Sequence, residues 1–167
     1  MRFKLVESLR EAMQVRRLRN ECRAQLTNSK DHIGLLKQSR WYFQNYRSAK
    51  KTGNYRLYLL YDERGSAVGY GALALNDGKL LITECVGLSY RGRKYGRLIL
   101  DSLIHLASAE GRDLVAEIWA DNVSSLALHR GAGFALEAQL MKAGEELQRH
   151  LLAYSPENNT NSAGRGK

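Results

Sequence analysis

Hydrophobic and polar residues follow a helical period over the first third of the chain. Ser8-Leu9-Arg10-Glu11 fits a capping box, in which the Ser8 hydroxyl and the Glu11 carboxylate each bond the other's backbone amide. We therefore expect a helix from there to about Asn20. A second helix is predicted to start near Ser29 or Asp31, because apolar residues recur every three or four positions after it. Its end is indicated by Gly53.

From residue 54 the pattern changes to that of β-strands. Residues 55–61 and 67–75 are rich in β-forming residues and are joined by the turn Asp62-Glu63-Arg64-Gly65, so they predict a hairpin. A second turn, Asn76-Asp77-Gly78, leads into a strand over residues 79–86. The rest of the chain predicts, in order, a helix at 95–109, a strand at 114–119, a helix at 122–131 and two strands at 134–141 and 148–154.

This order of elements predicts an α/β fold. The expected architecture is a mixed, mostly antiparallel sheet of about six to seven strands with helices on both faces. Residues 1–154 form the predicted domain. Residues 155–167 carry Pro156, three Asn and no large apolar side chain, so we expect this tail to be disordered.

The composition is that of one globular domain. The chain has 167 residues, of which 44% are hydrophobic and 26% charged, so it is long enough to bury a core. No apolar run reaches membrane-spanning length and the N-terminus lacks a signal-peptide pattern, so the expected compartment is the cytoplasm, with no membrane partner. Cys22 and Cys85 lack metal-ligand spacing, so we expect reduced thiols and no metal site.

Positive charge is concentrated near the N-terminus. The formal net charge is +9, and the first 56 residues hold 14 Lys and Arg against 4 Asp and Glu. Such an excess fits a solvated helical face, an anionic small ligand or nucleic acid. Nucleic acid is the least favoured of the three, because basic and aromatic residues do not interleave on strands and no helix-turn-helix is recognisable.

A basic turn follows the strand at 79–86. Residues 86–96, Val-Gly-Leu-Ser-Tyr-Arg-Gly-Arg-Lys-Tyr-Gly, contain a strand end, a glycine-bearing turn and the start of a helix. Backbone N–H groups at such a junction bind phosphate oxygens, which favours a diphosphate ligand. Neither common nucleotide-loop fingerprint is present. A solvated turn is the alternative, but here the turn joins two elements that are predicted to be buried.

This turn, together with residues 122–134, resembles the GNAT superfamily of acyl-coenzyme A dependent N-acetyltransferases. Arg91-Gly92-Arg93-Lys94-Tyr95-Gly96 is similar to the family's pyrophosphate loop, with Lys94 at a position where glycine is common. Asn122-Val123-Ser124-Ser125-Leu126-Ala127-Leu128-His129-Arg130-Gly131-Ala132-Gly133-Phe134 is similar to a second family motif. There Ser125 replaces an Ala, His129 replaces a Tyr, and Gly133-Phe134 matches. The resemblance covers roughly residues 1–154.

The resemblance implies an N-acetyltransferase that uses acetyl-CoA. The cofactor's pantetheine arm would bond the backbone of the strand end, and its pyrophosphate would lie on the basic turn. The implied cofactor-binding residues are Val86, Leu88, Arg91, Gly92, Arg93, Lys94, Tyr95, Gly96, Arg97, Asn122 and Ser125.

Acetyl transfer to an amine needs an unprotonated amine, donors for the oxyanion and a proton for the leaving thiolate. We expect a backbone N–H near Cys85 or Val86 to meet the oxyanion. His129 stands where related enzymes place a Tyr acid, with a packing role as the alternative. Glu117 and Glu84 are candidate bases, with exposed-strand and salt-bridge roles as their alternatives.

In the family, the first two helices and the last hairpin form the acceptor side. Here that region carries Arg19, Arg40 and Trp41, and cationic groups beside aromatic faces suit an anionic amine. A weaker resemblance to amino-sugar acetyltransferases of the pseudaminic acid type makes a nucleotide-linked amino sugar the first candidate. The alternatives are a protein N-terminal or ribosomal-protein acetyltransferase, and a non-catalytic CoA-binding basic adaptor on RNA. The sequence leaves monomer and homodimer open.

Overall fold

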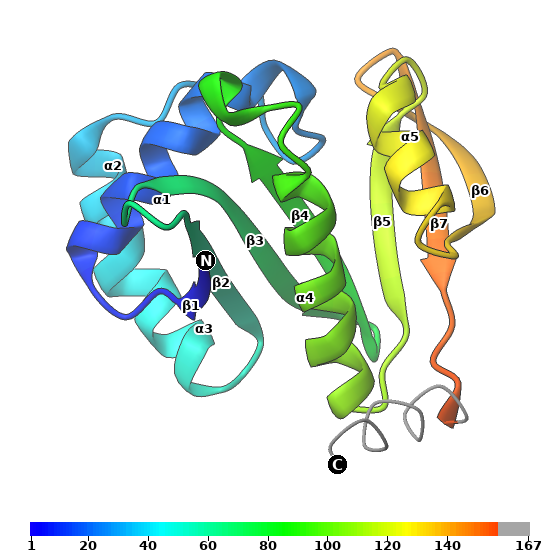
Figure 1. Ribbon diagram of the computed structural model, residues 1–167, viewed down its shortest axis with the longest axis horizontal. Helices are drawn as coiled ribbons and strands as arrows, with labels where there is room; N and C mark the ends of the chain where they lie inside the picture. The colour runs from blue at the N-terminus through cyan, green and yellow to red at the C-terminus, as the bar shows by residue number, and fades with distance from the viewer. Residues whose placement is uncertain (157–167) are drawn as a thin grey trace.

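A single seven-stranded sheet forms the centre of the molecule, with strand order β1-β2-β3-β4-β5-β7-β6 (Figure 1). The computed structural model describes residues 1–156, so the predicted disorder of residues 157–167 lies outside the described residues. The strands are β1 (Arg2–Leu5), β2 (Tyr55–Tyr61), β3 (Ala67–Asn76), β4 (Lys79–Val86), β5 (Leu114–Trp119), β6 (Ala135–Lys142) and β7 (Glu145–Leu152). The α/β class and the mostly antiparallel sheet are confirmed, because only β4 and β5 pair in parallel.

Helices cover both faces of the sheet, as the sequence predicts. The helical segments are α1 (Leu9–Cys22), η1 (Arg23–Gln25), α2 (Leu35–Trp41), η2 (Tyr42–Tyr46), α3 (Arg47–Lys51), η3 (Leu88–Tyr90), α4 (Tyr95–Ala109) and α5 (Val123–Arg130). Residues of α1 and η2 pack with one face of β2, β3 and β4 in one apolar cluster. Residues of α4 and α5 pack with the opposite face in a second cluster. Two separate cores therefore hold the sheet between layers of helix.

The parallel pairing of β4 and β5 is short. It joins Leu80, Leu81 and Ile82 to Leu114, Val115 and Ala116 and then ends. Beyond Ile82 the two strands diverge toward the end of β4, as the ribbon shows (Figure 1). The outer edge of β4 keeps its pairing with β3 through Val86. Within the described residues, the edge of β4 that faces β5 therefore has no strand partner from Thr83 to Val86.

The N-terminal region differs from the sequence prediction in two places. The capping box forms, because Ser8 accepts from the Glu11 amide at 3.3 Å and donates its own amide to Glu11 at 3.0 Å. However, β1 was not predicted, although residues 2–5 alternate polar and apolar. The second helix begins at Leu35 rather than near Ser29, because Asn20 bonds both the amide and the carbonyl of Ile33 and holds the preceding loop extended.

The second helix also contains a π segment. Residues Tyr42–Tyr46 interrupt the α-helical pattern between α2 and α3. The hydroxyls of Tyr42 and Tyr46 donate to the backbone carbonyls of Glu7 and Val6 at 2.6 and 2.7 Å. Because one wide turn rotates the helix face, both tyrosines reach the start of α1 while Trp41 stays beside them, stacked on Tyr46.

Gly69 and Gly71 allow α4 to lie close against β3, since a Cβ at Gly71 would stand 2.9 Å from Ile99. A Cβ at Gly69 would stand 2.7 Å from the Cys85 carbonyl oxygen and 2.7 Å from Ile99, so no side chain fits there. We expect Gly69→Ala to destabilise the protein by about 1–3 kcal/mol through overpacking. Gly34→Ala is the matched control, since a Cβ there meets nothing within 4 Å. Urea denaturation of both variants tests this, and equal stabilities would contradict it.

Candidate functional site

A cleft of about 490 Å³ opens where β4 and β5 diverge, and we call it the strand cleft. The end of β4, the basic turn, the start of α4, the middle of β5 and the first turns of α5 form its walls. Of the predicted cofactor-binding residues, those that line it are Val86, Arg91, Gly92, Lys94, Tyr95, Gly96, Arg97, Asn122 and Ser125. All three predicted catalytic residues, Glu84, Glu117 and His129, line it as well.

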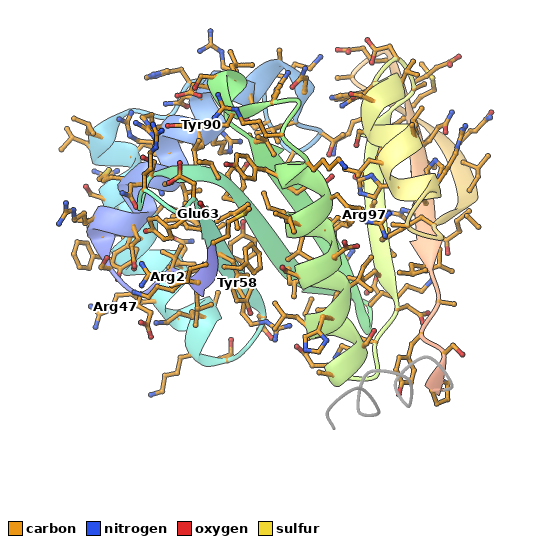
Figure 2. All side chains as sticks on the ribbon, viewed as in Figure 1. Arg2, Arg47, Tyr58, Glu63, Tyr90 and Arg97 are labelled. Carbon is orange, nitrogen blue, oxygen red and sulfur yellow. The ribbon has the colours of Figure 1, made fainter. Side chains whose placement is uncertain are left out.

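Two predicted cofactor contacts are not among the lining residues. Leu88 lies in η3 with 55% of its side chain exposed, and Arg93 is exposed on the outside of the turn. Figure 2 places the neighbouring Tyr90 at the same end of the molecule, above α1. The turn therefore presents only some of its side chains to the strand cleft.

The backbone of the basic turn has the form of an anion cradle. Gly92 and Lys94 both have positive φ, of 75° and 64°, and α4 starts at the next residue. The first amides of a helix have no partner inside it, so they are free to bind an anion in front of the helix. Lys94 thus adopts the left-handed conformation for which glycine is favoured, at a cost of about 1–2 kcal/mol. The lysine at the family's glycine position therefore adopts a backbone conformation that glycine would adopt without strain.

The arginines of the turn are held by neighbouring elements. Arg91 donates to the Gln25 side chain and lies 3.5 Å from the Val86 carbonyl oxygen. Arg97 pairs with Asp101 at 2.8 Å and donates to the Gly131 carbonyl at 3.0 Å, so it reaches across from α4 to the end of α5 (Figure 2). Their charge stays at the mouth of the strand cleft, where it favours an anion.

The backbone of Val86 faces into the strand cleft. Hydrogen bonding alternates along a strand, and the amide of Leu80 bonds toward β5 whereas that of Gly87 bonds toward β3. By this alternation the amides of Glu84 and Val86 point toward β5, into the region where β5 has moved away. Cys85 instead pairs with Tyr70 of β3. Of the two predicted oxyanion donors, Val86 is therefore the one that the strand geometry leaves free.

Glu84 and His129 form a buried pair beside this backbone. The His129 Nδ1 atom lies 2.8 Å from the Ser125 carbonyl oxygen, so Nδ1 carries a proton and donates it there. The Nε2 atom lies 3.3 Å from a Glu84 carboxylate oxygen, within ion-pair range but misaligned for a hydrogen bond. Burial raises the pKa of Glu84, and the His129 charge opposes that rise. Two titratable groups therefore face each other at the wall of the strand cleft.

Glu117 is held in a different environment. Its carboxylate accepts from Arg149 of the neighbouring strand at 2.9 Å and lies 3.8 Å from Lys142. Glu117 therefore pairs with two cations. A salt-bridge role had been the alternative for Glu84, whereas the alternative for Glu117 had been an exposed strand residue. Asn122 is also engaged, because its side-chain oxygen caps α5 by accepting from the Ser125 amide at 3.3 Å.

A second cavity of about 420 Å³ lies between α1, α2, the π segment and strands β2 to β4, and we call it the aromatic cavity. Its aromatic walls are Trp41, Tyr46, Tyr55 and Tyr70. Arg16, Arg19 and Lys37 also line it, and no carboxylate is among its lining residues. Thr83 lines both this cavity and the strand cleft, so the two meet at β4. Of the predicted acceptor-binding residues, Arg19 and Trp41 line this cavity, whereas Arg40 lies exposed on α2 and lines neither.

Several lining residues were missed by the sequence analysis. Cys22 at the end of α1, Gln25 in η1 and Thr27 just after it reach the strand cleft from the segment between the two predicted helices. Tyr55 and Tyr70 reach the aromatic cavity from strands β2 and β3. Period-two burial places Tyr70 inside but gives no sign that a cavity lies beside it.

The fold and the strand cleft are those expected of an acyltransferase with a coenzyme A thioester as cofactor. A sequence model described as the acetyltransferase (GNAT) family matches residues 12–134, and the chain belongs to this family. It is therefore an N-acetyltransferase whose cofactor is acetyl-CoA. The free amides of the turn, its arginines and the unpaired edge of β4 suit the cofactor's diphosphate and its amide-bearing arm.

Solved structures share the fold. A ribosomal-protein-alanine N-acetyltransferase from Brucella melitensis has a TM-score of 0.77 at 20% identity, over 92% of this chain and 99% of that one. A phosphinothricin acetyltransferase from Sinorhizobium meliloti, solved with acetyl-CoA, has 0.72 at 20% identity, over 93% and 90%. A chimera of the Vibrio cholerae spermidine N-acetyltransferase and hSSAT has 0.76 at 13% identity, over 95% and 99%. No curated protein sequence matches the chain.

Two further findings concern residues 1–156 alone. No helix in this range is long and apolar enough to cross a membrane. Within the same range, no three His, Cys, Asp or Glu side chains are grouped in a way that could hold a metal ion.

Gly96 gives a direct test of the cofactor site. A Cβ there would lie 3.5 Å from Leu128 and 3.9 Å from Val86, so alanine fits, whereas a longer side chain has to project into the strand cleft. We expect Gly96→Leu to weaken acetyl-CoA binding by about 1–3 kcal/mol, and Gly96→Ala to retain most of the affinity. Titration calorimetry measures both, with thermal denaturation as the check on folding. Equal affinities for the two variants would contradict the placement.

Proposed function

We propose that this N-acetyltransferase acts on the primary amine of a small anionic acceptor that binds in the aromatic cavity. The observation that carries the proposal is the charge of that cavity. Its lining has three cationic side chains and no carboxylate, and it meets the strand cleft at Thr83. An acceptor in the aromatic cavity is therefore adjacent to the site where the acetyl group is held.

The hydrogen bonds inside the aromatic cavity support the same acceptor chemistry. Arg16 and Arg19 donate to backbone carbonyls of residues 29–33. These bonds occupy some of the guanidinium N–H groups, but a carbonyl carries no net charge, so the two positive charges are not neutralised by them. The Tyr70 hydroxyl is buried and has no hydrogen-bond partner within residues 1–156. Burial raises the pKa of Tyr55 to about 12, so its hydroxyl also remains a donor. Donors and positive charge together favour carboxylate, phosphonate or phosphate groups on the acceptor.

The proposed roles of the site residues follow from their atoms. When bound, acetyl-CoA supplies the acetyl group and a thiolate leaving group. The Val86 amide donates to the oxygen that becomes negative as the amine attacks. His129 Nδ1 is committed to the Ser125 carbonyl, so a proton for the thiolate has to come from the facing Nε2 and Glu84 atoms. We assign this pair as the general acid. Glu117 pairs with Lys142 of β6 and Arg149 of β7, and we assign it a structural role in holding these strands to β5.

An acceptor panel tests the proposal. Thiol release from acetyl-CoA is measured with anionic amines, including amino acids, aminophosphonates and a nucleotide-linked amino sugar, and with polyamines and peptide N-termini. We expect the anionic small amines to have the highest kcat/KM. A preference for polyamines would contradict the charge argument, and a preference for peptides would favour the protein N-terminal alternative. RNA binding without thiol release would favour the adaptor alternative.

Variants of the cavity arginine sharpen this test. Arg19→Gln should raise the KM for the anionic acceptor about tenfold, because a loss near 1.4 kcal/mol is expected for a charge-assisted contact. Arg19→Lys should keep most of that affinity, since the charge is preserved. Arg40→Gln is the matched control, because Arg40 lies exposed on α2, away from both cavities. Equal KM values for Arg19→Gln and Arg40→Gln would exclude a role for the cavity charge.

The raised pKa of Glu84 also predicts how stability depends on pH. The folded protein holds this proton more tightly than the unfolded chain, whose pKa is about 4.3. The free energy of unfolding therefore falls as the pH rises from that value through the folded pKa. Glu84→Gln cannot ionise, so its stability relative to the parent protein should increase over this window.

Urea denaturation between about pH 4 and pH 8 measures this change. Glu117→Gln is the control of opposite sign, because it removes a carboxylate that pairs with Arg149 and so should lose stability at neutral pH. Parallel pH curves for Glu84→Gln and the parent protein would show that burial does not perturb Glu84.

A further inference from the structure

The two cysteines of the chain meet at the wall of the strand cleft. Cys22 lies at the end of α1 and Cys85 near the end of β4, and both line the cleft. The Cys22 Sγ atom lies 3.2 Å from the carbonyl oxygen of Val86, the residue after Cys85, and the Cys85 Sγ atom lies 3.6 Å from the carbonyl oxygen of Leu18, one turn before Cys22 on α1. The two side chains are therefore adjacent. The exposed fractions of their side chains are only 4% and 6%, so they are reached through the cleft rather than from the outer surface.

Charged and polar groups from three elements face Cys22. The Arg91 guanidinium lies 3.6 Å from its Sγ atom, and Glu21 acts in the opposite sense from α1 itself. The Val86 carbonyl oxygen, 3.2 Å away, accepts from the thiol form. The neighbouring Cys85 thiol and the Arg91 guanidinium lower the pKa of the Cys22 thiol, whereas the proximity of Cys22 and burial raise the pKa of Cys85. Arg91, in contact with the Cys22 Sγ atom, makes Cys22 the first nucleophile, and the adjacent Cys85 is the thiol that resolves it.

We propose that Cys22 and Cys85 form a reversible thiol–disulfide pair that reacts with hydroperoxides when the strand cleft is empty. The Cys22 thiolate attacks one peroxide oxygen and breaks the O–O bond, which gives a sulfenic acid and, for hydrogen peroxide, one water. Cys85 then attacks the Cys22 sulfur, forms the S–S bond and releases a second water. Two thiols are oxidised by two electrons in total and the peroxide is reduced, so the step is balanced.

The disulfide removes contacts that shape the cofactor site. The Cys22 sulfur contacts both Arg91 and the Val86 carbonyl oxygen, and Val86 carries the free backbone edge of β4. Arg91 also donates to that same oxygen from the basic turn. Drawing Cys22 toward Cys85 therefore weakens the anchor of Arg91. We expect the oxidised protein to bind acetyl-CoA more weakly than the reduced one, and bound acetyl-CoA to protect the thiols.

Peroxide treatment followed by peptide mass spectrometry under non-reducing conditions tests the pair. The expected result is a Cys22–Cys85 linked peptide that dithiothreitol removes, together with slower formation when acetyl-CoA is present. In Cys85→Ala, dimedone should trap a sulfenic acid at Cys22. In Cys22→Ala, Cys85 should stay unmodified under the same conditions. Thermal denaturation of both variants establishes that they are folded.

Replacing Arg91 separates an activated thiol from an ordinary buried one. Arg91→Gln should slow the alkylation of Cys22 by iodoacetamide at neutral pH severalfold, because loss of the guanidinium raises the pKa of the thiol and lowers its thiolate fraction. Arg93→Gln is the matched control, because Arg93 is exposed and does not line the strand cleft. Failure to form the linked peptide, or first reaction at Cys85, would overturn the proposal. These readouts use no amine acceptor, so they are independent of the proposed function.

Discussion

The strand cleft exists because the parallel pairing of β4 and β5 ends at Ile82, before the end of β4. Three residue pairs hold the strands together, and beyond Ile82 the amides of Glu84 and Val86 have no strand to bond. An unpaired sheet edge inside a protein is costly unless something else bonds it. The cofactor's pantetheine arm carries amide groups that could bond this edge, and the unpaired first amides of α4 favour an anion at the far end. Sheet geometry, rather than any single side chain, creates the site.

Residues of β4 line both the strand cleft and the aromatic cavity, which differ in their chemistry. On the α5 side, Glu84 and His129 lie in a buried pair close to the free backbone. On the α1 side, tyrosines and arginines surround a space with no carboxylate. Side chains alternate across a strand, so neighbouring residues such as Thr83 and Glu84 serve opposite faces. Donor and acceptor can therefore approach from opposite sides of the sheet and meet at its opening.

The sequence predicted most of what depends on local pattern. The capping box at Ser8, the hairpins and the basic turn before α4 follow from residue types at short spacing, and the family resemblance led to the prediction of a cofactor site there. Elements that depend on distant contacts were missed or misplaced. The short strand β1 exists because β2 offers an edge, and α2 starts late because Asn20 holds Ile33. Tyr70 and Cys22 are ordinary buried residues by pattern, and only the fold brings them beside a cavity. Arg40, on α2, is exposed and lines neither cavity, which residue type and spacing alone do not reveal.

Each of the two tryptophans lies beside a different cavity, so the intrinsic fluorescence of the protein can report on both. Trp41 forms part of the wall of the aromatic cavity. Trp119 donates its indole N–H to the carbonyl of Leu26, a residue that lines the strand cleft, and Lys30 lies over its ring. A ligand in the aromatic cavity changes the surroundings of Trp41, and a ligand in the strand cleft changes those of Trp119. Intrinsic fluorescence, with one tryptophan replaced at a time, can therefore separate the order in which the two substrates enter.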